Sequence, residues 1–199
     1  MGASQGWVNA YRRFSDEVIW PRGMPLAAAN RPGSIALASE PPPGVAGDAP
    51  IQQGLADGSP DVEAVWRLLM NRPVVFRRTP SLRLTQGQWC PINSQSTWWW
   101  PDAYPLLYLP STCTFRTTDI WRGLVAQRCL WELGHGLEFH AAEVHQDRNP
   151  RAPSRDFEDE LPGYLHTEAS ARCLTALHLR RSADGAAAHV RACSRALVD

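Results

Sequence analysis

The chain has 199 residues, of which 44% are hydrophobic and 20% are charged, so it can bury a core and is not disordered throughout. Twenty basic and twenty acidic residues cancel, which argues against a nucleic-acid-binding protein and against a polybasic membrane-surface protein. The apolar runs are shorter than the ~18 residues of a membrane helix, and the first residues lack the pattern of a signal peptide. We expect a single folded unit without a signal or anchor in this chain.

Residues 1–30 predict a helix followed by an Arg-Gly segment. Apolar residues recur at near-helical spacing over 7–19, and the helix should end at Trp20-Pro21, because a residue before proline avoids helical angles. Residues 22–26 then form a turn. Residues 31–50 contain three consecutive prolines and have the composition of a loop or insertion.

Residues 51–182 are expected to form the main folded domain. Residues 51–55 form a short strand, and Ser59-Pro60-Asp61 starts a helix, with Ser as the N-cap and Pro at the first position. That helix should end near Pro73. Residues 73–76 and 82–84 have the pattern of strands.

Residues 86–117 show neither a strand period nor a helix period. Thr118 is then predicted to cap a helix, with Asp119 in its first turn and Gly134 as its C-terminal stop. A strand follows at 137–140. The alternation of strands and helices predicts an α/β fold in which parallel pairing is favoured.

The C-terminal third predicts little regular structure. Residues 145–167 are polar and irregular, with one helical turn at 155–160. The Ala-rich residues 168–182 form a last helix, and residues 183–199 are expected to be a disordered tail.

Two single residues are candidates for chemistry, and each has two interpretations. Asp119 either stabilises a helix N-terminus or is a carboxylate at the mouth of the sheet that accepts a proton from an attacking hydroxyl. His145 is either a surface loop residue or a functional one, because polar residues surround it. The five-residue spacing of His135, His140 and His145 does not suit a three-His metal site.

The aromatic and acidic clusters also have two interpretations each. Trp89, Trp98, Trp99 and Trp100 suit stacking against a sugar ring, or else they pack in the core. The acidic run 156–160 is either a solvated face or the carboxylate pair of a glycoside hydrolase.

Long stretches of the sequence resemble the plant STELLO-type glycosyltransferases over roughly residues 20–166. The stretches are WPRGMPL (20–26), QGLADGSPDVEAVWRLL (53–69), the segment 89–134, VHQDRN (144–149) and DFEDELPGYLH (156–166). A more distant resemblance runs to the plant UDP-arabinopyranose mutases (reversibly glycosylated polypeptides). Their Arg-Gly-Tyr-Pro segment is similar to residues 22–25, and their Asp-Asp-Met-Trp helix start is similar to residues 118–121.

The resemblance implies a GT-A type fold, a Rossmann-like α/β sandwich that binds a nucleotide sugar through Mn²⁺ or Mg²⁺. Such a cation neutralises the charge that gathers on a diphosphate leaving group. The family further implies a glycan or protein acceptor, a Golgi location and a link to the cellulose synthase complex.

The resemblance also assigns roles to residues of this chain. It implies that Asp119 holds or deprotonates the acceptor, that His145 is a metal ligand, and that Arg22 contacts the sugar or a phosphate. Asn93 and Thr118 lie in the matched stretches and are substrate-binding candidates together with Arg22 and the four tryptophans.

The sequence departs from the family pattern in three respects: it contains no Asp-x-Asp motif, it lacks the family's membrane anchor, and the similarity fades beyond His166. We therefore expect the C-terminal half of such an enzyme, in a truncated form that is either active or inactive by itself. One alternative is a non-catalytic module that binds a partner in a polysaccharide synthase complex through the Trp-rich surface. Another is a carboxylate-pair glycosidase that uses residues 156–160.

Overall fold

A mixed four-stranded sheet is the centre of the fold. The structure is a computed structural model and describes residues 6–29, 49–147, 152–179 and 185–197. The strand order is β3 (Leu82–Leu84), β6 (Leu137–Gln146), β2 (Ile51–Gly58) and β5 (Thr97–Trp99). β2 and β6 are parallel, whereas β3 and β5 pair antiparallel at the two edges.

The predicted α/β class is confirmed, and it is consistent with part of a Rossmann-like domain. Within this sheet, parallel pairing holds only for the central pair β2 and β6, whose connection includes the helices α3 and α4.

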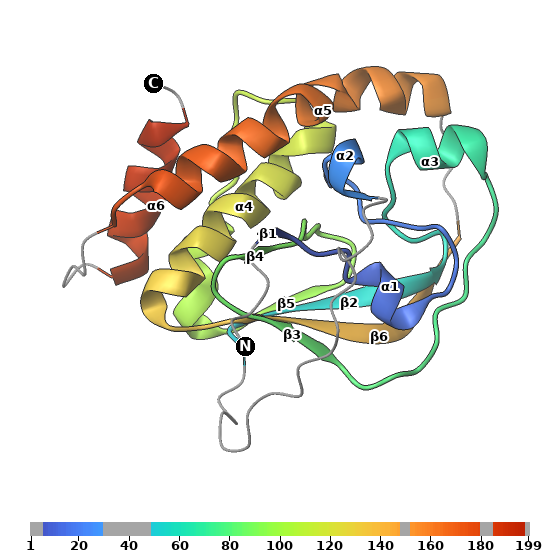
Figure 1. Ribbon diagram of the computed structural model, residues 1–199, viewed down its shortest axis with the longest axis horizontal. Helices are drawn as coiled ribbons and strands as arrows, with labels where there is room; N and C mark the ends of the chain where they lie inside the picture. Colours follow the sequence, from blue (N-terminus) through green and yellow to red (C-terminus); the bar gives the residue numbers. More distant parts are fainter. Residues whose placement is uncertain (1–5, 30–48, 148–151, 180–184, 198–199) are drawn as a thin grey trace.

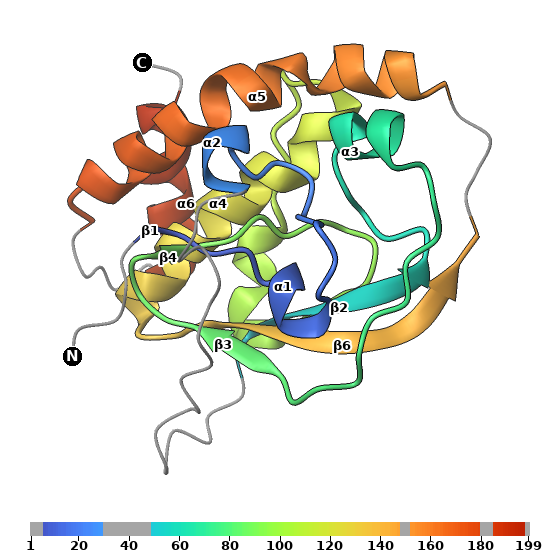
Figure 2. The same ribbon diagram turned by 45° about the vertical axis from the view of Figure 1, so that its right-hand side comes forward.

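Three long helices cover one face of this sheet (Figures 1 and 2). α4 (Phe115–Leu133) lies next to the strands, and α5 (Pro153–Ala176) and α6 (Gly185–Ala196) pack against it. Gly134 ends α4 as predicted, with φ 80° in the left-handed region that glycine adopts without strain.

The C-terminal prediction was wrong in two places. Within the segment predicted to be irregular, residues 145–167, β6 extends to Gln146, and α5 begins at Pro153 and continues to Ala176, into the range of the predicted last helix. Residues 185–196 are not a disordered tail but form α6, whose buried residues are Ala186, His189, Val190 and Cys193. This spacing is the one-faced pattern of an amphipathic helix, which a tail assignment overlooks.

The N-terminal segment forms a small sheet instead of one long helix. β1 (Gly6–Trp7) pairs parallel with β4 (Gln88–Trp89), and only α1 (Tyr11–Phe14) is helical within the predicted range 7–19. The Ser15 hydroxyl accepts a hydrogen bond from the Glu17 N–H (3.1 Å), and this local turn ends the helix. α2 (Leu26–Ala29) follows. Most of the proline-rich segment, residues 30–48, lies outside the described residues.

The helix predicted to start at Ser59 begins later. α3 spans Ala64–Leu69, because the carbonyls that an earlier start would use accept hydrogen bonds from other segments: the Ser59 carbonyl from Gln95 Nε2 (2.8 Å) and the Asp61 carbonyl from the Tyr11 hydroxyl (2.9 Å). The strand expected at 73–76 is reduced to a single bridge between Val74 and Gly58. The strands expected at 51–55, 82–84 and 137–140 are confirmed, two of them in longer form.

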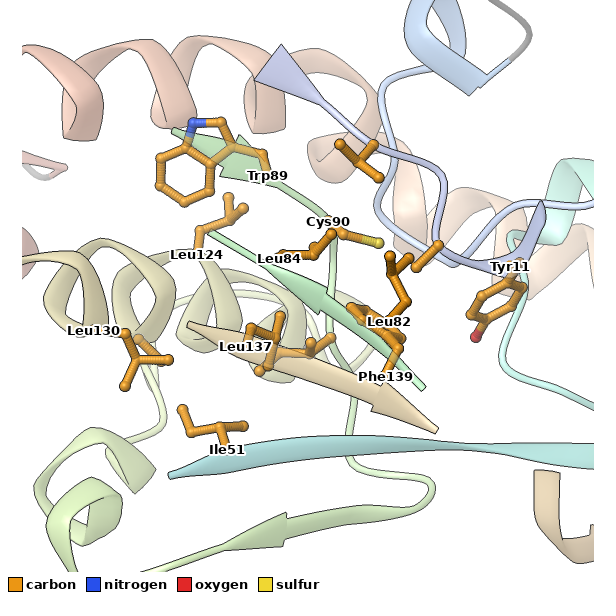
Figure 3. Packing of buried hydrophobic residues seen from close by; sticks show 14 of the residues in the cluster. Tyr11, Ile51, Leu82, Leu84, Trp89, Cys90, Leu124, Leu130, Leu137 and Phe139 are labelled. Atoms are coloured by element: carbon orange, nitrogen blue, oxygen red, sulfur yellow. The ribbon is translucent and has the colours of Figure 1, made fainter. Parts of the chain in front are cut away.

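The core lies between the sheet and α4 (Figure 3). Ile51, Phe139 and Leu124 are fully buried there, and the core extends to the 3-10 helix η1 (Pro101–Leu107) through Ala103 and Leu106. α4 packs tightly against the loop between β4 and β5, since a Cβ at Gly123 would lie 2.6 Å from Ile92 Cγ1. Within the described part of the chain, we find no helix with the length and apolar character needed to cross a membrane.

The docking of α6 can be tested at Val190. A Val190→Asp substitution puts an unpaired charge in a site that is 8% exposed, and we expect it to lower the opening free energy of α6 by at least about 2 kcal/mol. Amide hydrogen exchange of residues 185–196 measures this change. Arg191→Asp, at an exposed neighbour, is the control and should leave exchange nearly unchanged. Equal exchange in both variants would contradict the packing of α6 on α4.

Candidate active site

A buried arginine joins two aspartates that are far apart in the sequence. Arg22 Nε and Nη2 donate to both oxygens of Asp61 (2.9 and 2.8 Å), and Nη2 also donates to both oxygens of Asp119 (3.1 and 3.0 Å). Arg22 Nη1 donates to the Arg116 carbonyl. The three side chains are between 7% and 13% exposed. Burial alone would lower the pKa of Arg22, but the two carboxylates outweigh it and raise the pKa, so this group is a permanent cation.

Backbone and side-chain contacts hold the segment around Arg22 in place. Pro21 forms an antiparallel bridge with Val62, and Trp20 Nε1 donates to Glu63 Oε2 (2.7 Å). Gly23 has a φ of 86°, and a Cβ there would lie 2.3 Å from Ile120 Cγ2. A side chain at this position would therefore push the segment away from α4, which explains why glycine follows Arg22.

The Arg22 network lies at a cavity of about 320 Å³ that we name the Arg22 cavity. Three arginines and three aspartates line it, so its formal charges balance: Arg22, Arg67 and Arg116 with Asp61, Asp119 and Asp156. Ser59 and Gln146, which lie at the carboxyl ends of the parallel strands β2 and β6, also line it. Open α/β sheets bind ligands at this edge of their parallel strands.

Asp119 faces this cavity from the second turn of α4. The helix begins one turn earlier than predicted, at Phe115 with Thr114 as the N-cap, so Thr118 is not the cap. Instead the Thr118 hydroxyl donates to the Pro110 carbonyl (2.7 Å) and ties α4 to the preceding loop. Asp119 Oδ2 accepts a further hydrogen bond from the Ser94 N–H (3.0 Å). The carboxylate is therefore fixed in orientation by α4, Arg22 and the loop before β5.

Asn93 shapes that loop rather than facing the cavity. It is 2% exposed, and its Oδ1 accepts hydrogen bonds from the Gln95 N–H (2.9 Å) and Gln53 Nε2 (3.3 Å). Gln95 in turn donates to the Ser59 carbonyl (2.8 Å). Asn93 thereby positions Ser94 and Gln95, which do line the cavity.

The four tryptophans do not form one surface. Trp89 is 4% exposed, contacts Trp131 (ring centroids 4.4 Å apart) and lies in the core, outside the Arg22 cavity. Trp99 is half-buried against the Arg122 guanidinium, 4.8 Å from its ring centroid. Trp98 and Trp100 are 40% and 50% exposed on either side of it. Alternation along β5 explains this arrangement, since neighbouring side chains point to opposite faces.

His145 lies near the Arg22 cavity but not in it. It lines an adjacent cavity of about 210 Å³ that shares Ser59, Arg67 and Gln146 with the Arg22 cavity. Its Nε2 is 3.2 Å from Asp147 Oδ1, and its side chain is 65% exposed. Among the described residues no three His, Cys, Asp or Glu side chains are grouped so that they could hold a metal ion. The described residues therefore do not by themselves form the Mn²⁺ or Mg²⁺ site that the resemblance implies.

The acidic run on α5 is divided between two places. Asp156 lines the Arg22 cavity, whereas Glu160 is 3% exposed and pairs with Arg116. Glu160 Oε2 also accepts hydrogen bonds from the Ala64 N–H (2.8 Å) and the Tyr164 hydroxyl (2.9 Å). These contacts give Glu160 a structural role and do not favour a carboxylate pair for glycoside hydrolysis.

Asp61 is the principal site residue that we did not predict. Sequence reasoning assigned it to the first turn of a helix, where acidic residues occur for electrostatic reasons. Its partner Arg22 is 39 residues away, and no local pattern reports such a pairing. The one available signal was that both residues lie in stretches resembling the same family.

The fold is an α/β domain with a polar cavity at the carboxyl ends of its parallel strands. No protein-family model matches the sequence. The chain is 34% identical to "Probable glycosyltransferase STELLO2" and 31% identical to "Probable glycosyltransferase STELLO1", both of Arabidopsis thaliana, over 77% and 70% of this chain. The matched part of the chain belongs to the STELLO-type glycosyltransferase family. The chain spans about a fifth of the length of these relatives (20% and 18%).

Glu63, behind the Arg22 cavity, gives a pH test of this arrangement. Burial, with a smaller contribution from Glu160, raises the pKa of Glu63 to about 8, although Trp20, Gly23 and Arg22 oppose the shift. The unfolded chain ionises Glu63 near its ordinary value of 4.5, so the folded state binds the proton more tightly. The stability that this proton provides is complete below about pH 4.5 and is lost as the pH rises to about 8.

Glu63→Gln keeps an acceptor for the Trp20 indole and removes the titration. We expect the free energy of unfolding of the wild type, relative to Glu63→Gln, to fall between pH 4.5 and 8. Urea unfolding at a series of pH values measures this difference. Curves that stay parallel across the range would contradict the buried position of Glu63.

Proposed function

We propose that this chain forms the acceptor side of a glycosyltransferase that transfers sugar from a nucleotide sugar to a glycan or protein acceptor. The observation that carries the proposal is Asp119, a carboxylate held by Arg22 and the Ser94 N–H at the Arg22 cavity. The relatives are named as probable glycosyltransferases, which supports the reaction class. A Golgi location and an association with a cellulose synthase complex belong to the same proposal.

In this proposal Asp119 accepts a hydrogen bond from the acceptor hydroxyl, orients it and takes its proton as the new bond forms. Arg22 fixes the direction of the carboxylate, so that the lone pair not used by Arg22 or Ser94 faces the ligand. Polar side chains at the ends of β2 and β6 bind the sugar hydroxyls. A divalent cation, when bound, supplies charge neutralisation to the diphosphate; because the described residues do not form its site, we assign no step to it.

Asp119→Asn tests this role. The substitution keeps the hydrogen-bonding shape and removes the base, so we expect sugar transfer to fall by at least about 100-fold while UDP-sugar binding persists. UDP release from a panel of UDP-sugars with glycan acceptors measures transfer, and calorimetry measures binding.

Asp16→Asn is the matched control, because the Asp16 side chain is 84% exposed and lies outside the Arg22 cavity. It should transfer sugar at nearly the wild-type rate. Both variants are made in the full-length protein that contains this chain, and transfer that survives in Asp119→Asn, or a full-length wild type that binds no UDP-sugar at millimolar concentration, would contradict the proposal.

A second candidate function rests on an exposed aromatic segment. Trp98, Trp100, Tyr104 and Tyr108 are each at least 40% exposed within eleven residues of chain, together with Leu107 and Leu109. Contiguous exposed apolar side chains mark interaction sites. They support a non-catalytic role in which this segment binds a protein of a polysaccharide synthase complex.

The two functions separate by mutation. Trp98→Ala with Trp100→Ala should abolish binding to a synthase partner in a pull-down or surface-plasmon-resonance assay and leave UDP-sugar binding intact. Asp119→Asn should keep partner binding. Partner binding that is unaffected by the double substitution would exclude this surface.

A further inference from the structure

Arg122 is a buried arginine that forms no ion pair with either aspartate of the Arg22 network (Arg22, Asp61 and Asp119). It is 6% exposed, yet within the described ranges no Asp or Glu oxygen lies within ion-pair distance of its guanidinium. Nη2 donates to Ser94 Oγ (3.0 Å), the Trp99 ring covers one face, and Nε is buried without a hydrogen-bond partner. A buried charge without an opposite charge nearby is energetically unfavourable unless a bound ligand supplies the opposite charge.

Asp119, one helical turn before Arg122, does not supply that partner. It attracts Arg122 through space, but burial is the larger effect and lowers the pKa of Arg122. Both Asp119 oxygens already accept hydrogen bonds from Arg22, and one of them accepts from the Ser94 N–H. Among the described residues, therefore, no carboxylate forms an ion pair with the Arg122 guanidinium.

Arg122 also lines a cavity of about 280 Å³ that is separate from the Arg22 cavity. This second cavity lies between the loop 108–113, α4 and α6. Its walls are mostly apolar, formed by Trp121, Val125 and Leu197 among others, and the loop adds the hydroxyls of Ser111 and Thr112. Arg122 is the one charged residue among its described lining residues.

We propose that this cavity binds a small ligand with an apolar body and one anionic oxygen group, a carboxylate or a phosphate monoester. The anionic group would pair with the Arg122 guanidinium and accept hydrogen bonds from the loop hydroxyls. The apolar body would lie against α4 and α6. Planar guanidinium groups bind both kinds of oxyanion in a bidentate manner, so the two ligand sources share one chemistry.

The test compares three aromatic probes of similar shape: benzoate, phenyl phosphate and the neutral benzamide. We expect benzoate or phenyl phosphate to bind the 199-residue chain and raise its melting temperature, and benzamide to bind at least about tenfold more weakly, because a hydrogen bond to a charged group is stronger than one to a neutral group. Chemical-shift perturbation locates the site through the Trp121 indole. Comparison of the two anions shows which oxyanion is preferred.

Arg122→Met keeps the length of the side chain and removes its charge. Anion affinity should fall by about tenfold or more, whereas the unliganded protein should unfold at the same or a higher temperature, since an uncompensated buried cation is lost. Arg172→Met, at an arginine on α5 whose side chain is 72% exposed, is the control and should bind the anions like the wild type.

Two results would overturn the proposal. One is equal binding of benzamide and both anions by the wild-type chain, a comparison that does not depend on any variant folding. The other is undiminished anion binding by Arg122→Met.

Discussion

The pairing of Arg22 with Asp61 and Asp119 is the constraint on which the arrangement of this chain depends. A guanidinium that is 6% exposed needs opposite charge within hydrogen-bond distance, and two carboxylates from distant segments supply it. The segment before α2, the loop after β2 and the start of α4 must therefore meet. The late start of α3 is consistent with this meeting, because the Asp61 carbonyl accepts a hydrogen bond from the Arg22 N–H (3.3 Å) and Val62 forms a bridge with Pro21.

The mixed sheet places this meeting point where ligands bind in α/β proteins. β2 and β6 run parallel and end together, so Ser59 and Gln146 arrive side by side at the Arg22 cavity. The antiparallel edge strand β5 brings Trp99 against Arg122 on α4. One helix thus presents Asp119 and Arg122 to two neighbouring cavities, one balanced in charge and one with an uncompensated cation.

Local pattern predicted the elements whose own sequence is sufficient to define them. The strands at 51–55, 82–84 and 137–140 and the end of α4 at Gly134 agree with the structure, because alternation and a left-handed glycine are local properties. The helix expected over 7–19 fails because the Ser15 turn and the pairing of β1 with β4 compete with it. α6 was missed although its buried residues recur at helical spacing, because the tail assignment overlooked this pattern, whose buried face packs against α4.

The amino-acid sequence by itself determined the α/β class, the family likeness and the candidacy of Arg22 and Asp119, since these depend on residue types and their order. Tertiary structure alone decided that Asp61 completes the pair, that Trp89 lies in the core and that Arg122 is left without an anion. Spacing along a chain specifies which face of an element a side chain occupies. It does not specify which distant group will meet that face, because that choice depends on how all the elements pack together.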